Sequence, residues 1–433
     1  MVESMKVNIA YDRLGEYNLS QSLPDRFKIA PKWLEFDFDG VVEDTIDNFV
    51  NRQENFVYNL GTIGGPTYWL GGRDRLFDHL STRLIEHAQK GKVYIHISQS
   101  MEGFPLNEVS TQYNKIKSFD AFRKLHDNLD HYRIPSNKLI FSTSNLIEQY
   151  NYNSWCSTNN VAESKRFHIV ALPFFACSAQ HNIFFDWADR PDNKYYPKFV
   201  CIENVMYQDH LNYKSTYPIK LFNCLNRMQR THRAPFVAML NYFGLVDGNI
   251  VSHNKLKQPL SVSNWPDHPA FKDPNFTSIK NKLPLTYDME DFSVNYAQNF
   301  NKKIYLNTYL SVISESYYED RNPSVFFSEK IFKPIRANHP FIIICHTYGL
   351  HWLRKLGFRT FDKWWDESYD EEADPVKRME MICTVLKKLE KLSAQDWYSL
   401  YNDMEEVLTH NYKHFIETDW WRGKYNAIIK KFF

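Results

Sequence analysis

The chain has few glycines and prolines for its length, 14 and 19 among 433 residues, while aromatic residues make up 16%. This composition excludes collagen-like, low-complexity and disordered proteins, which are rich in glycine, proline or polar residues. No apolar run is long enough for a membrane-spanning helix, because the longest, 169–177, has nine residues and a span needs about 20. We therefore expect a globular chain that does not cross a membrane.

Closely spaced cysteines are also lacking. The six cysteines lie at least 21 residues apart, which gives neither a C-x-x-C motif nor a zinc-ribbon spacing. Residues 1–18 contain no apolar run behind their charges, so no secretory signal is expected. These features predict buried, reduced thiols in a cytoplasmic protein.

Neither charge sign dominates. Lys and Arg number 52 against 51 Asp and Glu, which gives a net charge of +1. This balance lacks the electrostatic footprint of a dedicated nucleic-acid or membrane-surface binder. The first 215 residues hold 23 basic and 26 acidic side chains, and the remainder hold 29 and 25. A phosphate-bearing ligand is therefore expected in the second half.

Helical periodicity alternates with short β-rich runs, which is typical of doubly wound α/β domains with parallel sheets. We predict two such Rossmann-like domains, residues 1–216 and 217–433. In the first, we expect helices over 76–88 and 119–132 and strands over 93–97, 138–141 and 167–175. In the second, we expect strands over 219–225, 309–314 and 340–345, helices over 231–243 and 349–356 and from 328, 375 and 394 onward, and mostly loop over 252–288.

The segment FFSEKIFKPIR, residues 326–336, places several polar and charged side chains at a predicted helix start. Ser328 is suited to cap the helix, whose first N–H groups lack partners and whose dipole end is positive. With Lys330 and Lys333 beside them, these groups would form a diphosphate site, and Glu329 would accept hydrogen bonds from ribose or sugar hydroxyls. The alternative is that Glu329 only complements the dipole and that both lysines are solvated.

A second basic segment, KLFNCLNRMQRTHR, covers residues 220–233. A strand there runs directly into positive charge and then into a helix, and the carboxyl end of such a strand borders the ligand crevice. Arg227 and Arg230 would clamp a diphosphate, and Asn226 would fix the loop. The alternative is a turn with surface arginines.

Three other features carry weaker indications. Asp37 and Asp39 form a D-x-D pair that would suit a divalent cation, but their alternation with apolar residues already places them on the solvent face of a strand. No metal is therefore expected.

Five glycines lie within residues 61–72. Their spacing fits neither of the two glycine-rich phosphate-binding motifs, G-x-x-x-x-G-K-[ST] and G-x-G-x-x-G, and suggests a loop that lines a cleft. The aromatic and acidic stretch 364–370 suits either sugar stacking or packing.

Four segments together resemble one known group. FNCLNRMQRTHR, SVISESYYE, FFSEKIFKPIRANHPFIII and LGFRTFDKWWDESYDEE resemble the carboxy-terminal domain of a glycosyltransferase group with GT-B architecture, common in tailed bacteriophages and some bacteria. The resemblance covers roughly residues 217–415. The S/T-E-K helix start is also similar to the donor-binding motif of α1,3-fucosyltransferases.

The resemblance implies that the second domain holds a nucleotide-diphosphate sugar, that the first approaches the acceptor, and that the intervening cleft needs no metal or further cofactor. Glu329 and Lys330 match fucosyltransferase residues that contact the donor, and Arg227 matches a diphosphate-binding arginine by position in the domain. Phe326 stands where that motif usually begins with Tyr, and the likeness is local, so fucose is not implied. The predicted donor-binding residues are Asn226, Arg227, Arg230, Ser328, Glu329, Lys330 and Lys333.

Transfer to a hydroxyl also needs a general base, and an inverting enzyme uses a carboxylate for this step. Glu102 is our candidate, because it follows the strand over 93–97 at the crevice end of the first sheet and precedes Gly103. The alternative is a surface loop carboxylate.

The acceptor is predicted to be a saccharide or another hydroxyl compound, since the first half is slightly acidic. One alternative is a phage enzyme that glycosylates hydroxymethylated bases in DNA. Another is a non-catalytic carbohydrate-binding or interaction protein on the same fold.

Overall fold

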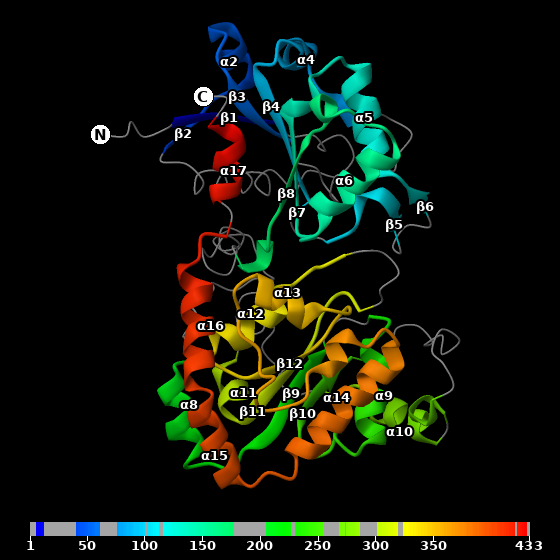
Figure 1. Cartoon of the computed structure of the whole chain (residues 1–433), viewed down its shortest axis with the longest axis vertical. Coiled ribbons are helices and arrows are strands. Elements are labelled where there is room, and N and C mark those ends of the chain that lie inside the picture. Colours follow the sequence, from blue (N-terminus) through cyan, green and yellow to red (C-terminus); the bar gives the residue numbers. More distant parts are fainter. Residues whose placement is uncertain are drawn as a thin grey trace. The chain divides into compact units, whose positions relative to one another are not determined.

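The computed structural model describes residues 6–12, 40–60, 76–99, 103–111, 116–176, 205–226, 230–254, 268–272, 274–285, 301–318, 324–420 and 422–430. The chain divides into two compact units, each of which contains a parallel sheet with helices (Figure 1). Unit 1 comprises Met1–Arg190, Asn322–Phe326 and Asp419–Phe433, and unit 2 comprises Pro191–Arg321 and Phe327–Thr418. The α/β class predicted from the sequence is confirmed, and the domain boundary at 216/217 stays a prediction.

Unit 1 contains a six-stranded parallel sheet in the order β2-β1-β3-β4-β7-β8. Strands β3, β4 and β7 are buried along nearly their whole length, as expected for a parallel sheet with both faces covered. The direction of winding reverses between β1 and β3. The strands are β1 (Lys6–Asp12), β2 (Gly40–Glu43), β3 (Phe56–Leu60), β4 (Val93–Gln99), β7 (Leu139–Thr143) and β8 (His168–Ala171), beside a small antiparallel pair, β5 (Val109–Thr111) and β6 (Ile116–Phe119).

The helices of unit 1 that begin at residues 82 and 121 follow capping side chains. Asp120 accepts a hydrogen bond from Arg123 N at 3.0 Å, and Ser81 accepts one from Leu84 N at 3.3 Å. The cap at Ser81 divides the helix predicted over 76–88 into a 3-10 turn and a shorter α-helix. The helices are α2 (Ile46–Arg52), α4 (Thr82–Gln89), α5 (Ala121–His131), α6 (Glu148–Thr158) and α17 (Arg422–Ile429).

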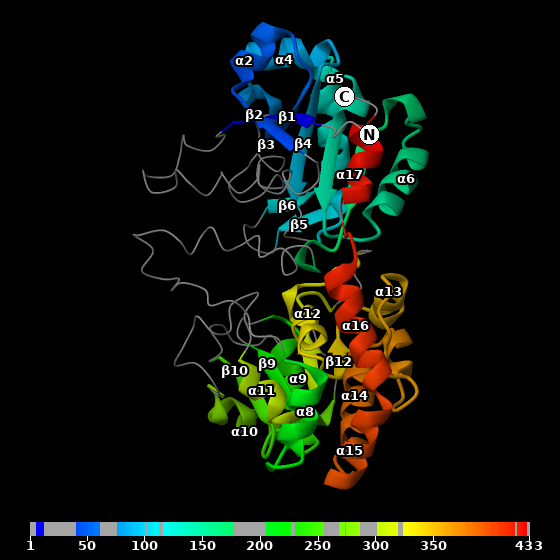
Figure 2. The ribbon, with the colours of Figure 1, turned by 90° about the vertical axis from the view of Figure 1, so that its left-hand side faces the viewer.

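Two segments distant in sequence complete unit 1. Helix α17, from the end of the chain, lies among the elements of unit 1 (Figure 2) and packs against β8. The Tyr425 hydroxyl lies in a buried network with Ser142 and His96. Residues 324–326 pack beside α6, where Val325 N donates to Asn145 Oδ1 at 2.9 Å. Both attachments rest on contacts between residues more than 170 positions apart, which local sequence patterns do not reveal.

Unit 2 contains a four-stranded parallel sheet in the order β10-β9-β11-β12. From β9 the chain moves outward to β10 and then returns to the other side of β9 for β11, so the winding reverses between β9 and β11. The carboxyl ends of these two strands lie at one edge of the sheet. The strands are β9 (Lys220–Asn226), β10 (Ile250–His253), β11 (Thr308–Ser314) and β12 (Phe341–Ile344).

The helices of unit 2 form two packed groups. Helix α9 contacts both α10 and α14, while α8 contacts α11, α15 and α16, and α16 contacts α12 (Figure 1). Side chains of Asp374 and Ser393 cap α14 and α15, as the sequence predicted. The helices are α8 (Tyr207–Lys214), α9 (Arg233–Tyr242), α10 (Asn275–Lys282), α11 (Lys302–Leu306), α12 (Glu329–Arg336), α13 (Gly349–Lys355), α14 (Pro375–Leu389), α15 (Ala394–Asp403) and α16 (Glu405–Glu417).

Several predicted elements differ from the structure. The stretch 252–288 contains the end of β10 and the whole of α10, whose weak apolar pattern rests mainly on Phe276 and Ile279. The helix predicted from 394 onward is divided at Met404 into α15 and α16. The strand predicted over 167–175 ends at Ala171 and is followed by a short helical turn after Pro173.

The aromatic and acidic stretch 364–370 has a packing role. Glu367 accepts hydrogen bonds from Phe361 N at 2.8 Å and Arg354 Nη1 at 3.1 Å, and burial raises its pKa to about 7. Asp370 accepts hydrogen bonds from Leu350 N at 2.8 Å and from the next amide at 3.0 Å, at the start of α13. These two carboxylates hold the fold around α13.

Gly349 begins α13 in close contact with the end of β12. A Cβ atom at this position would lie within 3.0 Å of the Cys345 sulfur, a separation that real Cβ atoms essentially never show. We expect Gly349→Ala to lower the free energy of unfolding by about 1–3 kcal/mol through overpacking. In urea denaturation, Cys345→Ala in the same chain should recover part of this loss. If the changes in the free energy of unfolding caused by the two single substitutions simply add in the double variant, the proposed clash is contradicted.

Candidate functional site

The candidate site lies at the edge of unit 2 where β9, β10 and β11 end, which we call the carboxyl edge. Its three strand-terminal residues are Asn226, His253 and Ser314. Helix α9 begins a few residues after β9, and α12 begins 15 residues after β11. Ligands of doubly wound sheets bind at such an edge, at the position where the winding reverses.

The start of α12 brings three predicted site residues together. Ser328 is the N-cap, and its Oγ accepts a hydrogen bond from Lys330 N at 3.3 Å. The Lys330 ammonium lies 2.9 Å from Glu329 Oε1, 3.1 Å from Ser328 Oγ and 3.4 Å from the hydroxyl of Ser316. The helix start therefore combines the positive end of a helix dipole, a cation and a carboxylate within one turn.

Glu329 is an ionised acceptor in this setting. Its side chain is 19% exposed. Burial by itself raises the pKa of Glu329, but the positive charges of Lys330 and Lys333 outweigh burial and hold the pKa below its usual range. An ionised carboxylate offers only acceptor oxygens, so its natural partners are hydroxyl or amine groups.

Glu315, which the sequence analysis did not select, connects β11 to the start of α12. Its buried Oε2 accepts hydrogen bonds from Ser316 N at 3.1 Å, Ser328 N at 3.2 Å and Ser328 Oγ at 2.5 Å. Burial raises the pKa of Glu315, although the charge of Lys330 opposes the shift. Its position directly after a predicted strand was the one available indication.

His232 and Arg233, at the start of α9, hold the end of β11. Arg233 Nη2 donates to Ser314 O at 3.1 Å and to Glu315 O at 3.3 Å, and His232 Nε2 lies 2.9 Å from the Glu315 carbonyl. Burial lowers the pKa of Arg233 to about 10, and the charge of Arg230 contributes to this shift. The sequence analysis placed the diphosphate arginines at Arg227 and Arg230 and missed Arg233.

The remaining predicted residues have different outcomes. Arg230 is partly exposed before α9, and Lys333 lies in the last turn of α12, partly buried. Arg227 and the candidate base Glu102 lie outside the described residues, as do Asp37, Asp39 and the glycine-rich stretch 61–72. The roles assigned to all of these residues stay predictions.

Three buried polar atoms mark the carboxyl edge. Asn226 Oδ1, His253 Nε2 and Ser314 Oγ have no hydrogen-bond partner in the part of the chain that the structure describes. Their residues are only 1%, 2% and 2% exposed. Asn226 and His253 are register partners, so their side chains leave the same face of the sheet. Buried polar groups are normally satisfied, so these three atoms are candidate contacts for a polar ligand.

Over the described ranges, no group of three or more His, Cys, Asp or Glu side chains is arranged to hold a metal ion. The four cysteines in those ranges, Cys156, Cys224, Cys345 and Cys383, are buried free thiols. None of the described helices has both the length and the apolar character needed to cross a bilayer.

No protein-family model and no curated protein matches the chain. Among solved structures, the N-terminal domain of Candida albicans trehalose-6-phosphate phosphatase is 10% identical, with a TM-score of 0.42 over 99% of this chain and 97% of that chain. Two structures of the wall teichoic acid polymerase TagF are each 11% identical with TM-scores of 0.27, covering 95% and 98% of this chain and 90% and 89% of theirs. At these TM-scores the likenesses assign no function, so the functional argument rests on the site.

Proposed function

We propose that the protein is a glycosyltransferase of GT-B architecture whose unit 2 binds a nucleotide-diphosphate sugar at the carboxyl edge. The observation that carries this proposal is the start of α12, where Ser328, Glu329 and Lys330 combine a capped helix N-terminus, a carboxylate and an ammonium. This start lies in the unit whose sheet reverses its winding between β9 and β11. The S-E-K motif and the other segments that resemble the glycosyltransferase group support the same assignment.

Each group has a distinct role in the proposal. The first-turn amides of α12 and the Lys330 ammonium bind the diphosphate and stabilise it as it leaves. Glu329 accepts hydrogen bonds from hydroxyls of the donor. Arg227 and Arg230 add positive charge beside the leaving group, with Lys333 in support. Asn226 fixes the loop that carries the two arginines.

The acceptor in the proposal is a hydroxyl compound, with a saccharide favoured over DNA because the first half of the chain has a slight acidic excess. Glu102 removes the proton of the acceptor hydroxyl as that oxygen attacks the anomeric carbon, and the nucleoside diphosphate departs from the opposite side. This in-line displacement inverts the anomeric configuration and uses no metal.

The test is a panel of UDP-, GDP-, ADP- and CMP-sugars, with nucleotide release measured with and without EDTA. We expect at least one donor to be turned over equally well in both conditions. Lys330→Met should weaken donor binding by about 10- to 100-fold, because a charge-assisted contact is lost. Lys363→Met is the matched control, since this exposed lysine pairs with Asp403 on the surface.

Two results would contradict the proposal at different points. If no donor binds or reacts, the glycosyltransferase assignment fails. If Lys330→Met leaves donor affinity unchanged, the donor site is misplaced. Glu102→Gln should retain donor binding and lose transfer, and full activity in this variant would remove Glu102 as the base.

A further inference from the structure

The ammonium of Lys330 is fully occupied by groups of unit 2. An ammonium has three N–H groups, and three acceptors surround this one: Glu329 Oε1 at 2.9 Å, Ser328 Oγ at 3.1 Å and Ser316 Oγ at 3.4 Å. Adjacent residues of a helix do not normally face each other. The ammonium meets Glu329 because the Lys330 side chain reaches back to the helix start, where both serines also lie. A ligand that binds this ammonium must therefore displace one of the three acceptors.

The two serines are held in place, so Glu329 is the acceptor that can be exchanged. Ser328 Oγ has one proton and two lone pairs, and the amide and ammonium of Lys330 are both donors. The Ser328 proton is therefore directed to Glu315 Oε2 at 2.5 Å, which also accepts a hydrogen bond from Ser316 N. Ser328 is only 1% exposed. The Glu329 side chain is 19% exposed, which leaves it room to turn toward a ligand.

A bare diphosphate meets an unfavourable exchange at this helix start. When it takes the ammonium, it separates Glu329 from Lys330 and places further negative charge beside the carboxylate. The partly buried carboxylate then lacks its partner, which costs free energy. A ligand that carries hydroxyl groups next to its diphosphate replaces the lost contact, because an ionised carboxylate accepts hydrogen bonds from hydroxyls. The two kinds of anion therefore differ in what they offer to Glu329.

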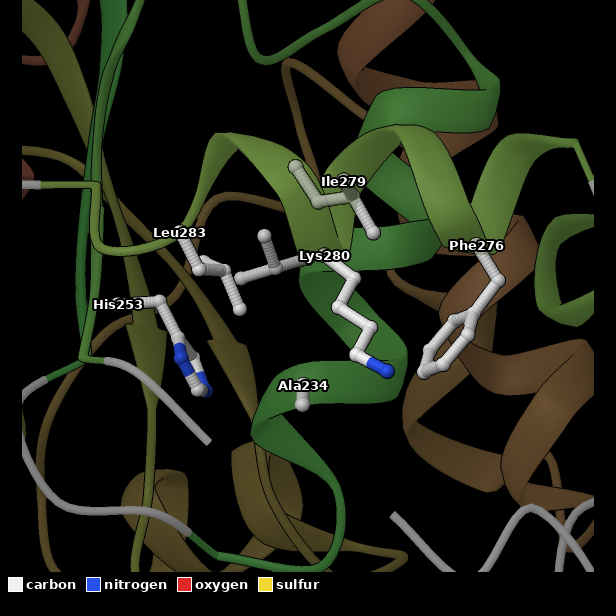
Figure 3. A pocket seen from close by; sticks show the side chains of 7 residues that line it. Ala234, His253, Phe276, Ile279, Lys280 and Leu283 are labelled. Atoms are coloured by element: carbon white, nitrogen blue, oxygen red, sulfur yellow. The ribbon is translucent and has the colours of Figure 1, made fainter. Parts of the chain in front are cut away.

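The hollow between α9, α10 and the end of β10 cannot supply this discrimination. Figure 3 shows the side chains of His253, Phe276 and Lys280 around it. The volume open to water there is about 10 Å³, which is room for about a single water molecule. A diphosphate or a sugar does not fit into such a space. The contacts that select a ligand are therefore expected at the start of α12.

We propose that Glu329 is a specificity-determining residue that makes the start of α12 reject bare phosphates. Its carboxylate occupies the Lys330 ammonium and is replaced there only by a ligand that brings hydroxyl donors beside a diphosphate, as a nucleotide-diphosphate sugar does. The inference rests on the proposed function for the position of the diphosphate. It adds an exchange of partners, in which the ammonium turns to the phosphate and the carboxylate to the hydroxyls of the ligand.

Calorimetric titration of the full chain in phosphate-free buffer tests this exchange, with pyrophosphate, UDP-glucose, GDP-mannose and ADP-glucose as probes. We expect the wild-type chain to bind at least one nucleotide sugar at least tenfold more tightly than pyrophosphate. In Glu329→Gln, pyrophosphate should bind about three- to tenfold more tightly, because the competing carboxylate is gone. The preferred nucleotide sugar should bind about three- to tenfold more weakly, because its hydroxyls lose a charged acceptor.

These opposite changes separate specificity from a structural role, which would weaken both kinds of probe together. Glu329→Asp keeps the negative charge at the helix start and should keep the pyrophosphate affinity close to that of the wild-type chain. Glu390→Gln is the matched control, because Glu390 also pairs with a nearby lysine, Lys387, but at the end of α14. It should leave all four affinities unchanged. Circular dichroism and thermal unfolding establish that each variant is folded before titration.

The outcomes distinguish the exchange from the proposed function. If Glu329→Gln leaves pyrophosphate affinity unchanged or weakens it, while Lys330→Met weakens every probe, the exchange is overturned and the donor site stands. If pyrophosphate binds more tightly to Glu329→Gln but no nucleotide sugar binds the wild-type chain, the specificity role and the glycosyltransferase assignment both fail. If Lys330→Met leaves all affinities unchanged, or if no probe binds any variant, the donor site is misplaced and the exchange fails with it.

Discussion

Replacing Arg233 with Met is expected to lower the free energy of unfolding of unit 2 by about 3–5 kcal/mol, the range found when one partner is removed from a buried charged network. Arg233 is 2% exposed, and its guanidinium joins the start of α9 to the Ser314 and Glu315 carbonyls. Methionine fills much of the same volume but donates no hydrogen bond. The end of β11 would then lose the hydrogen bonds from Arg233, while His232 would still contact the Glu315 carbonyl.

Hydrogen exchange of peptides from β11 and α9 measures this effect, because it reports the opening of unit 2 separately from unit 1. Arg230→Met is the matched control. This partly exposed arginine is expected to change stability by less than about 0.5 kcal/mol while weakening pyrophosphate binding. If Arg233→Met remains within about 1 kcal/mol of the wild-type chain, Arg233 does not hold the carboxyl edge.

Local chemistry accounts for the elements that the sequence predicted correctly. Ser328, Asp374 and Ser393 cap the helices that follow them, because a cap depends on residues within one turn. Gly244 and Gly357 follow helices with φ angles of 69° and 96°, where a side chain would be strained. Helix α10 was missed because its apolar periodicity is weak.

The candidate site likewise contains residues that local sequence predicted and residues that it missed. The sequence predicted Ser328, Glu329 and Lys330 from one helix start. Glu315 and Arg233 were missed, because their importance depends on how strand ends and helix starts meet in unit 2. Arg233 contacts Ser314 O across 81 positions of the chain. Such a contact follows from strand order and register, which no local pattern specifies.

Two glutamates of this chain, Glu329 and Glu148, have pKa values that are shifted in opposite directions. Glu329 has two lysines beside it, and its pKa lies below the usual range. Glu148, the first residue of α6 in unit 1, accepts hydrogen bonds from Leu106 N at 2.8 Å, Asn145 Nδ2 at 2.5 Å and Asn151 Nδ2 at 3.2 Å. No cation is among these partners, and burial raises the pKa of Glu148 to about 7.

Unit 1 should therefore lose stability as the pH rises from about 4.5 to about 7. The pKa of Glu148 is about 7 in the folded chain against 4.5 for an ordinary glutamate, so the folded state holds the proton more tightly. Stability is highest below the lower value and falls across this window, at 1.36 kcal/mol per pKa unit, by roughly 3 kcal/mol in total. Glu148→Gln should remove this slope.

Urea denaturation after equilibration at pH 5, 6 and 7.5 measures the slope, with β7 and α6 followed by hydrogen exchange pulses at one labelling pH. Glu163→Gln is the control, because Glu163 is exposed in the same unit and should leave the slope unchanged. If the free energy of unfolding changes with pH equally in Glu148→Gln and in the wild-type chain, ionisation of Glu148 does not destabilise unit 1 and the prediction is wrong.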